Sequence, residues 1–392
     1  MTQLRVAGLF AGIGGIERGL ANEGHRTVLL NEIDAGARAI LKAHFGSDLR
    51  ITKDISDLKR LPQVDLVAAG FPCTDISQAG RKTGIAGPQS GLIRHVWRLI
   101  EECRRPPEWL LLENVSYMLS LGKGAGLRHL VNAVERFGYR WAYRVVDARA
   151  FGVPQRRQRI IFLASQSNDP REVLFADDSD LESEYDDRIG EVDPSAGYGF
   201  YWTEGLRGLG WTKDAVPTIK GGSSLGIPSA PAIWYPDTGE VGTPQIEDAE
   251  RMQGFPADWT LPALTEGNGP SRKNGPRWKY VGNAVCVPMS QWIGERLRSP
   301  GTPVDGDWSQ PVSPGRWPRA AYGGAGKAWL APVSTRPRQE PFGLRKFLEL
   351  PLSPLSARAT AGFLSRTRRG KLRFSHGFIE GLERHMESWD AG

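Results

Sequence analysis

The feature that most constrains the fold is a series of short apolar runs separated by helix-like stretches. Such runs occupy residues 4–10, 27–32, 64–70, 108–115 and 159–165, and turn residues bound them. Between them lie amphipathic stretches such as SGLIRHVWRLIEECRR at 90–105. This alternation is typical of strands and helices in a doubly wound sheet. The sequence therefore predicts an α/β fold with a Rossmann-like, mostly parallel sheet.

The pattern changes after residue 165. Residues 168–193 hold eleven acidic residues against two arginines, and residues 197–245 are rich in Gly, Pro, Trp and Tyr. We interpret 1–166 as the first domain and 167–278 as a small irregular domain with a return segment, RMQGFP, at 251–256. A helix-like stretch at 279–298 would complete the first domain. Residues 299–340, where Pro and Gly are frequent, predict a linker, and 341–392 a basic C-terminal extension.

Composition limits the class of protein. The chain has 392 residues, of which 40% are apolar and 24% charged, as in ordinary globular proteins. Its three cysteines lie far apart without a CxxC pair, which argues against a disulfide framework and against a zinc site or other metal site. Without a signal-peptide pattern or an apolar run of about 18 residues, we expect a cytoplasmic protein. The net charge of +6 suits a polyanion such as nucleic acid.

A glycine-rich turn, FAGIGG at 10–15, follows the first apolar run and opens a helix. Glycines in this setting let the backbone approach a ligand, but the spacing suits neither a dinucleotide nor a triphosphate. Glu32 closes the second run, where an acid can accept from ribose hydroxyls, and Asp54 could accept from an adenine amino group. Either acid alone is more commonly a solvated carboxylate. In this order they favour a ligand that contains adenosine.

Cys73 and Glu113 each follow a predicted strand, at the edge where open α/β sheets bind ligands. An isolated cysteine is more often a small buried hydrophobe, and Asn114 beside Glu113 could equally cap a helix. A partly desolvated carboxyl at Glu113 would have a raised pKa and could donate a proton near neutral pH. Arg157 and Arg159 alternate on entry to a strand, so we expect both guanidinium groups on one face, where they could clamp a carboxylate or phosphate.

Taken in order, these motifs resemble the DNA (cytosine-5) methyltransferase family over roughly residues 4–166 and 246–296. The series comprises FAGIGG, Glu32, Asp54, GFPC at 70–73, ENV at 113–115, QRRQR at 155–159, RMQGFP and GNAV at 282–285. Each motif alone is weak, and the ordered set is specific. Two positions depart from the family: Gly8 stands where many relatives have an acidic residue, and Thr74 where glutamine usually follows the cysteine.

The resemblance implies a role for each matching residue. Cys73 would be the nucleophile, Glu113 would protonate cytosine N3, and Arg157 and Arg159 would hold the flipped base and support the site. The S-adenosylmethionine pocket would be lined by Phe10, Gly12, Ile13, Gly14, Gly15, Glu32, Ile33, Asp54, Ile55, Pro72, Asn283 and Val285.

DNA contacts are expected from two segments and a tail. Ser77, Arg81 and Lys82 belong to a glycine-rich loop at 76–92, which could close over DNA or be a solvated loop tip. Residues 218–229 would read base edges or form a structural glycine turn; their polar members are Thr218, Lys220, Ser223 and Ser224. The tail forms either a phosphate patch or a solvated basic face through Arg358, Arg366, Arg368, Arg369, Lys371 and Arg373.

The resulting hypothesis is a monomeric enzyme that methylates cytosine C5 in a specific sequence of double-stranded DNA. A cognate restriction endonuclease acting on the same site is the expected partner. Three alternatives stay open: an RNA cytosine-5 methyltransferase on the same scaffold, a DNA-binding relative without catalysis, and a nucleotide-dependent oxidoreductase. The intact Cys73 and Glu113 argue against the second, and the missing phosphate loop argues against the third.

Overall fold

The computed structural model describes residues 3–71, 92–179, 187, 189–206, 208–222, 230–264, 275–313, 315 and 317–390. The chain forms two compact units. Unit 1 comprises Met1–Asp147, Gln158–Asp180 and Val285–Arg338, and unit 2 comprises Ala148–Arg157, Leu181–Ala284 and Gln339–Gly392. Each unit is therefore built from segments that are distant in the sequence.

Unit 1 is organised around a nine-stranded sheet in the order β15-β14-β6-β8-β5-β4-β1-β2-β3. Its strands are β1 (Arg5–Leu9), β2 (Arg26–Asn31), β3 (Arg50–Thr52), β4 (Leu66–Gly70), β5 (Trp109–Val115), β6 (Arg140–Asp147), β8 (Gln158–Ser165), β14 (Ala320–Gly324) and β15 (Lys327–Leu330). The five apolar runs predict β1, β2, β4, β5 and β8 correctly. The α/β fold class is confirmed.

The sheet is parallel from β3 to β5 and antiparallel beyond it. The sequence pattern alone missed β6, which joins β8 through the short segment at 148–157. Such a short connection reverses the chain direction, because a parallel return would need a crossover of a dozen residues or more. The parallel half carries the glycine-rich turn and the predicted acids.

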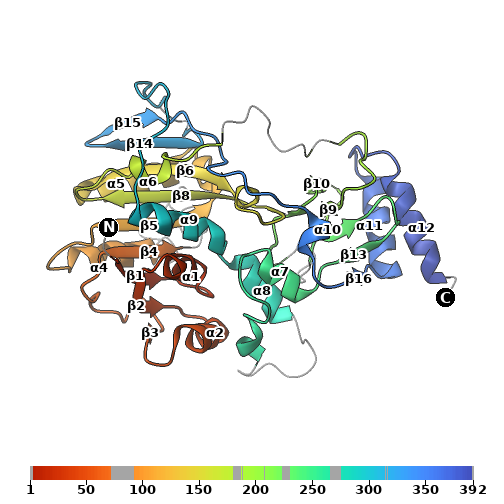
Figure 1. Ribbon diagram of the computed structural model, residues 1–392, viewed down its shortest axis with the longest axis horizontal. Helices are drawn as coiled ribbons and strands as arrows, with labels where there is room; N and C mark the ends of the chain where they lie inside the picture. Colours follow the sequence, from red (N-terminus) through yellow and green to blue (C-terminus); the bar gives the residue numbers. More distant parts are fainter. Residues whose placement is uncertain are drawn as a thin grey trace. The chain divides into compact units, whose positions relative to one another are not determined.

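Helices cover both faces of this sheet (Figure 1). Its helices are α1 (Gly15–Asn22), α2 (Ala35–Phe45), α4 (Leu92–Glu101), α5 (Ala125–Arg136), α6 (Arg171–Leu174) and α9 (Val287–Arg298). Side chains of α4 and α5 share one core with the odd-numbered residues of β1 and β4. Gly8, between two of those β1 residues, faces α1 instead, as strand alternation requires. Within the described ranges, no helix has the length and apolar character needed to cross a membrane.

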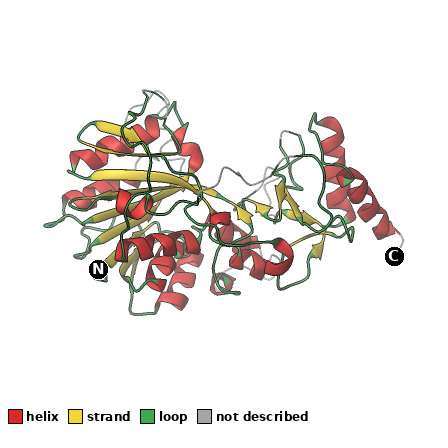
Figure 2. Ribbon diagram, turned by 45° about the horizontal axis from the view of Figure 1, so that its top comes forward, coloured by secondary structure: helices red, strands yellow, loops and turns green. Residues whose placement is uncertain are grey.

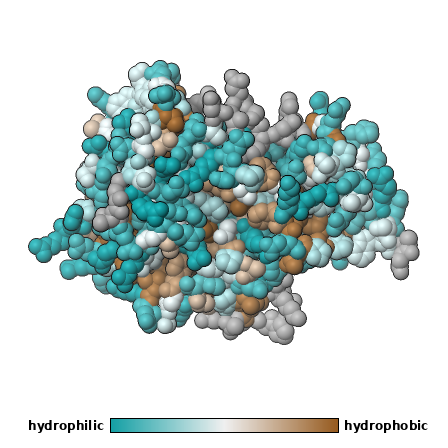
Figure 3. Space-filling view, in the orientation of Figure 1, coloured by the Kyte–Doolittle hydropathy of each residue, from teal (hydrophilic) through white to brown (hydrophobic). Residues whose placement is uncertain are grey.

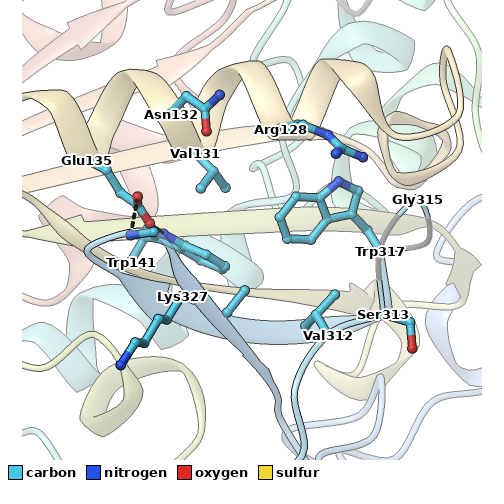
Figure 4. Close-up of a pocket in the computed structure, with 12 residues that line it drawn as sticks. Arg128, Val131, Asn132, Glu135, Trp141, Val312, Ser313, Gly315, Trp317 and Lys327 are labelled. Atoms are coloured by element: carbon cyan, nitrogen blue, oxygen red, sulfur yellow. Dashed lines mark hydrogen bonds between the residues drawn. The ribbon is translucent and has the colours of Figure 1, made fainter.

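Residues 299–340 differ from the predicted linker, because β14 and β15 extend the sheet next to β6. Figure 4 shows side chains of this region and of α5 around a pocket of about 260 Å³. Glu135 of α5 accepts from Trp141 Nε1 at 2.8 Å and from Gly326 N at 2.9 Å. Trp317 packs edge-on against Trp141. These aromatic contacts stabilise the segment, and the residues described along the pocket include none of the predicted site residues.

Unit 2 contains an antiparallel sheet in the order β10-β9-β12-β13-β16, visible among the yellow strands of Figure 2. These strands are β9 (Tyr198–Phe200), β10 (Thr212–Lys213), β12 (Ala232–Trp234), β13 (Val241–Thr243) and β16 (Ser353–Pro354). A parallel pair, β7 (Gln155–Arg156) with β11 (Val216–Pro217), lies in the same unit. Its helices are α7 (Ile246–Arg251), α8 (Gly275–Asn283), α10 (Leu344–Phe347), α11 (Ala357–Arg369) and α12 (Phe378–Asp390).

The C-terminal segment is not a separate extension. β16 pairs with β13, and α11 and α12 supply Phe363 and Phe378 to a core that also contains Phe200, Trp211 and Trp234. Phe378 is fully buried, and its ring lies 4.9 Å from that of Trp211 and 5.0 Å from that of Phe200. The tail therefore completes the hydrophobic core of unit 2.

The basic residues of the tail differ in their contacts. Arg366 donates to the carbonyls of Trp202 at 2.6 Å and Glu204 at 2.8 Å, so its guanidinium is engaged inside unit 2. Arg368 pairs with Glu383 on the adjoining helix at 2.8 Å. Side chains over α11 and α12 in Figure 3 are mostly hydrophilic. Arg366 thus has a structural role, whereas its exposed neighbours keep both interpretations open.

Phe378→Ala should destabilise unit 2, because it removes a fully buried ring from the aromatic core. We expect a loss of about 3 to 5 kcal/mol in the free energy of unfolding, measured by urea denaturation. Trp389→Ala on the same helix is the matched control, since Trp389 is 47% exposed. Equal stability of both variants would contradict a core role for the tail.

Candidate active site

The glycine-rich turn connects β1 to α1 through a tight backbone path. Phe10 has φ 54° and Gly14 has φ 86°, and Gly14 N donates to Ala11 O at 2.9 Å. Gly15 has no room for a side chain, because a Cβ there would overlap the carbonyl oxygen of Val285. A positive φ at a phenylalanine is uncommon and often marks a functional position. The turn is therefore held in place by the segment that leads into α9.

Glu32 fixes the shape of this turn. Its Oε2 accepts from Gly12 N and its Oε1 from Asp34 N, both at 2.8 Å. Burial raises the pKa of Glu32, and these two backbone donors oppose that effect. Asn31, the preceding residue, donates to Thr52 Oγ1 at 3.0 Å and joins the ends of β2 and β3. The carboxylate thus has one defined position at the carboxyl end of β2.

Asp54 lies just beyond β3, close in the chain to the Glu32 contact. Glu32 N donates to Thr52 O at 3.0 Å, so β3 ends beside Glu32. Asp54 Oδ1 accepts from Ser56 N at 2.8 Å, and the Ser56 backbone and hydroxyl donors lower the pKa of Asp54. Ile55 is buried in the core beneath it. Asp54 is consequently an ionised, partly exposed acceptor at neutral pH.

These residues fit the adenosine half of a nucleoside cofactor. Glu32 presents an oriented carboxylate, and beside it the side chain of Ile33 is 64% exposed, which offers an apolar surface for a purine ring. A Cβ at Gly12 would meet no described atom within 4 Å, so the space at this turn is open. Ile13 is buried beneath the turn.

Glu113 and Arg159 form a buried ion pair in unit 1. Arg159 Nε lies 2.9 Å from Glu113 Oε1, and both side chains are about nine-tenths buried. Their strands set this distance, because β5 pairs antiparallel with β8 and places Val115 opposite Arg159. Gly70 lies opposite Glu113 on β4, and a Cβ there would be 3.7 Å from Glu113 Oε2. The carboxyl group is therefore held at the end of β4.

Asn114 connects this acid to the start of the predicted nucleophile loop. Its Nδ2 donates to Phe71 O at 3.0 Å, and its Oδ1 accepts from Val115 N at 2.8 Å. Pro72 and Cys73 follow Phe71 directly but lie outside the described residues. The sequence allowed Asn114 to cap a helix, whereas in the structure it lies in β5 and binds the residue that follows β4. It positions the backbone that leads to Cys73.

Arg157 differs from the expectation that its guanidinium is available to clamp a ligand. Its side chain is 1% exposed within unit 2 and donates to three backbone carbonyls. The acceptors are Ile219 O at 3.1 Å, Gly282 O at 3.2 Å and Ala284 O at 2.5 Å. These bonds occupy the guanidinium that was predicted to clamp a ligand. Arg157 instead joins the 219–222 segment to the end of α8.

The remaining predicted residues of unit 2 surround the same segment. Asn283 ends α8, and its Oδ1 leaves no room for a Cβ at Gly221. The Thr218 hydroxyl donates to Arg156 O at 2.7 Å, so it already has an acceptor. Lys220 Nζ lies 3.8 Å from the centre of the Tyr201 ring. Ser77, Arg81, Lys82, Ser223 and Ser224 lie outside the described part of the chain.

Glu17 is a buried acid that belongs to none of the sequence motifs described above. It lies in the first turn of α1 and is 1% exposed. Burial raises its pKa to about 7, and the nearby Glu32 charge acts in the same direction. Its Oε2 has no hydrogen-bond partner among the described residues. The one indirect sign of Glu17 in the sequence is Gly8, which stands where many relatives have an acidic residue.

Comparisons with known proteins agree on one family. The model of C-5 cytosine-specific DNA methylases matches residues 4–201. The chain is 49% identical to the Type II methyltransferase M2.BsuMI of Bacillus subtilis (strain 168), over 97% of this chain and 98% of that protein. It is 28% identical to the Type II methyltransferase M.Bsp6I of Bacillus sp. (strain RFL6), over 75% and 98% of the two chains.

A solved structure supports the fold. The Entamoeba histolytica methyltransferase EhMeth superimposes with a TM-score of 0.51 and 15% identity, over 76% of this chain and 98% of that one. The chain belongs to the C-5 cytosine-specific DNA methylase family. It is a DNA cytosine-5 methyltransferase, which confirms the predicted family and enzyme class.

Glu17 should make stability depend on pH. Its folded pKa of about 7 lies above the ordinary 4.5, so its favourable contribution is complete below pH 4.5 and is lost as the pH rises through 7. The Glu17→Gln variant has no titrating carboxyl group at this position. Between pH 5 and 8 the cofactor-free wild type should lose roughly 2 to 3 kcal/mol relative to this variant, measured by urea denaturation. A difference that stays constant with pH would contradict the raised pKa.

Proposed function

We propose that this methyltransferase transfers the methyl group of S-adenosylmethionine to C5 of a cytosine within a specific sequence of double-stranded DNA. The observation that supports it best is the Glu113–Arg159 pair of unit 1, joined through Asn114 to the segment that precedes Cys73. An oriented acid and a thiol nucleophile are what cytosine C5 chemistry requires. The Glu32 turn, on the parallel half of the same sheet, would bind the cofactor.

The proposed mechanism begins with addition of the Cys73 thiolate to C6 of a cytosine turned out of the duplex. Glu113 donates a proton to N3, which makes C5 nucleophilic. When bound, S-adenosylmethionine supplies an electrophilic methyl group for C5. Water then takes the C5 proton while the bond between sulfur and C6 breaks, which releases 5-methylcytosine and the thiolate, and the N3 proton returns to Glu113.

Arg159 acts in this scheme as a positioning residue. It holds Glu113 Oε1 at 2.9 Å and donates through Nη1 to Gln158 O at 2.8 Å. Arg157 would have a different role from that implied by the resemblance, since it organises the backbone of 219–222 and the end of α8. We assign target recognition to unit 2, where Thr218 and Lys220 lie, and cofactor binding to unit 1, which includes Val285.

The covalent step can be captured directly. Duplex DNA with 5-fluorocytosine at the target should form a stable adduct with the enzyme when cofactor is present, because fluorine does not leave as a proton does. Cys73→Ala should abolish the adduct, as judged by denaturing electrophoresis. Cys103→Ala is the control, because Cys103 follows α4, where its Sγ donates to Leu99 O at 3.1 Å, and it should not affect trapping.

Continued methylation by the Cys73→Ala variant would overturn the mechanism. Transfer of labelled methyl groups to RNA, with none to duplex DNA, would favour the RNA methyltransferase alternative. If neither RNA nor DNA accepts a methyl group while DNA still binds, the alternative of a DNA-binding relative without catalysis is favoured.

Glu32→Gln should weaken S-adenosylmethionine binding, measured by calorimetry. An amide cannot accept from both Gly12 N and Asp34 N, since its nitrogen is a donor. We expect a loss of roughly 1 to 3 kcal/mol in binding free energy. Asp54→Asn should cost less, because Asp54 is more exposed. Unchanged binding in both variants would show that the pocket is placed elsewhere.

The target sequence is the remaining part of the proposal. Base edges in the major groove carry sequence information, so the residues that read it should belong to unit 2. Sequencing of methylated DNA from cells that express the chain would identify the site. We further propose a restriction endonuclease with the same site as the partner, and protection of DNA against cleavage at that site would support it.

A further inference from the structure

Gly8 of β1 stands where many relatives have an acid, and Glu17 of α1 places a carboxylate next to it. A Cβ built on Gly8 would overlap Oε1 of Glu17 and lie 2.8 Å from its Cδ. The φ of Gly8 is outside the left-handed region, so the backbone itself would accept another residue. Space, rather than conformation, excludes a side chain there. The Glu17 carboxylate occupies the place that a side chain at position 8 would enter.

This carboxylate has fewer partners than a buried acid normally has, because the only hydrogen-bond donor found for it among the described residues is its own backbone N–H. Glu17 is buried, its Oε2 accepts no hydrogen bond from the described residues, and no cation among them pairs with it. The carboxylate of Glu32 lies close enough to act on it electrostatically. Leaving a buried acceptor unsatisfied costs about 1 to 3 kcal/mol. Two neighbouring acids that have no cation beside them in the described part of the chain form a site that is electrostatically complementary to a positively charged ligand.

We propose that Glu17 replaces the family's acid at position 8 and provides, from α1, the negative charge that favours the α-ammonium end of the cofactor. This inference rests on the proposed use of S-adenosylmethionine. The ammonium is the better match than the sulfonium, because the reactive methyl must face the proposed acid, Glu113, at the ends of β4 and β5. Glu17 lies instead behind β1, next to the glycine-rich turn.

Three ligands separate the charges of the cofactor. S-adenosylmethionine carries the ammonium and the sulfonium, S-adenosylhomocysteine carries only the ammonium, and methylthioadenosine carries neither. By calorimetry, Glu17→Gln should weaken the first two by a similar factor of about ten and leave the third unchanged. Glu23→Gln, at the other end of α1, is the control for loss of a charge and should bind all three as the wild type does.

A pair of substitutions tests whether the carboxylate of Glu17 takes the role of an acid at position 8. Glu17→Ala should weaken S-adenosylmethionine binding, and adding Gly8→Asp to that variant should recover most of the affinity. With Glu17 truncated, the nearest obstacle to a Cβ at position 8 is the flexible Leu30 Cδ2, at 2.9 Å. Gly8→Asp alone should lower the melting temperature, because its side chain would collide with Glu17.

The outcomes are distinct. Equal binding of all three ligands by Glu17→Gln and wild type would overturn the inference, and so would an equal loss for all three, which indicates a structural role. A loss confined to S-adenosylmethionine would assign the charge to the sulfonium and overturn the ammonium assignment. A wild-type chain that binds none of the ligands would overturn the proposed function itself, and the inference with it.

Discussion

The register of β4, β5 and β8 is the constraint on which the proposed catalytic pair of Glu113 and Arg159 depends. It places Gly70 opposite Glu113 and Val115 opposite Arg159, so the acid and its guanidinium partner meet at 2.9 Å. A shift of one residue would turn Glu113 to the other face of the sheet. Since β8 runs antiparallel to β5, Arg159 enters at the carboxyl end of β5, where a parallel strand would have placed Ser165.

The proposed cofactor site depends on buried acids, whose burial costs free energy of folding. Glu32 is buried but has two backbone donors, whereas Glu17 is buried with an oxygen that no described residue satisfies. Such an arrangement lowers the stability of the ligand-free protein and is common where a site is organised for a charged ligand. The close approach of Gly15 to Val285 adds a second constraint, because it makes the turn depend on a segment 270 residues later in the chain.

Unit 2 shows how a segment can change role once the chain is folded. The basic tail supplies Phe363 and Phe378 to an aromatic core, and Arg366 serves backbone carbonyls of the same unit. Arg157 likewise donates to three carbonyls. In both cases an arginine that resembles a ligand contact in the sequence satisfies buried acceptors instead. The match to M2.BsuMI covers nearly the whole chain, so that relative shares the C-terminal part of unit 2 as well.

The sequence by itself determined the α/β class, five strands of the sheet and the family, because apolar periodicity and ordered motifs are local signals. The roles assigned to Cys73 and Glu113 remain predictions of that motif order. Only the tertiary structure decided that residues 320–330 extend the sheet, that the tail completes a core, and that Glu17 fills the space beside Gly8. Each of these features results from contacts between elements that are distant in the chain. A segment rich in Pro, Gly or Arg does not itself indicate which other element it will pack against.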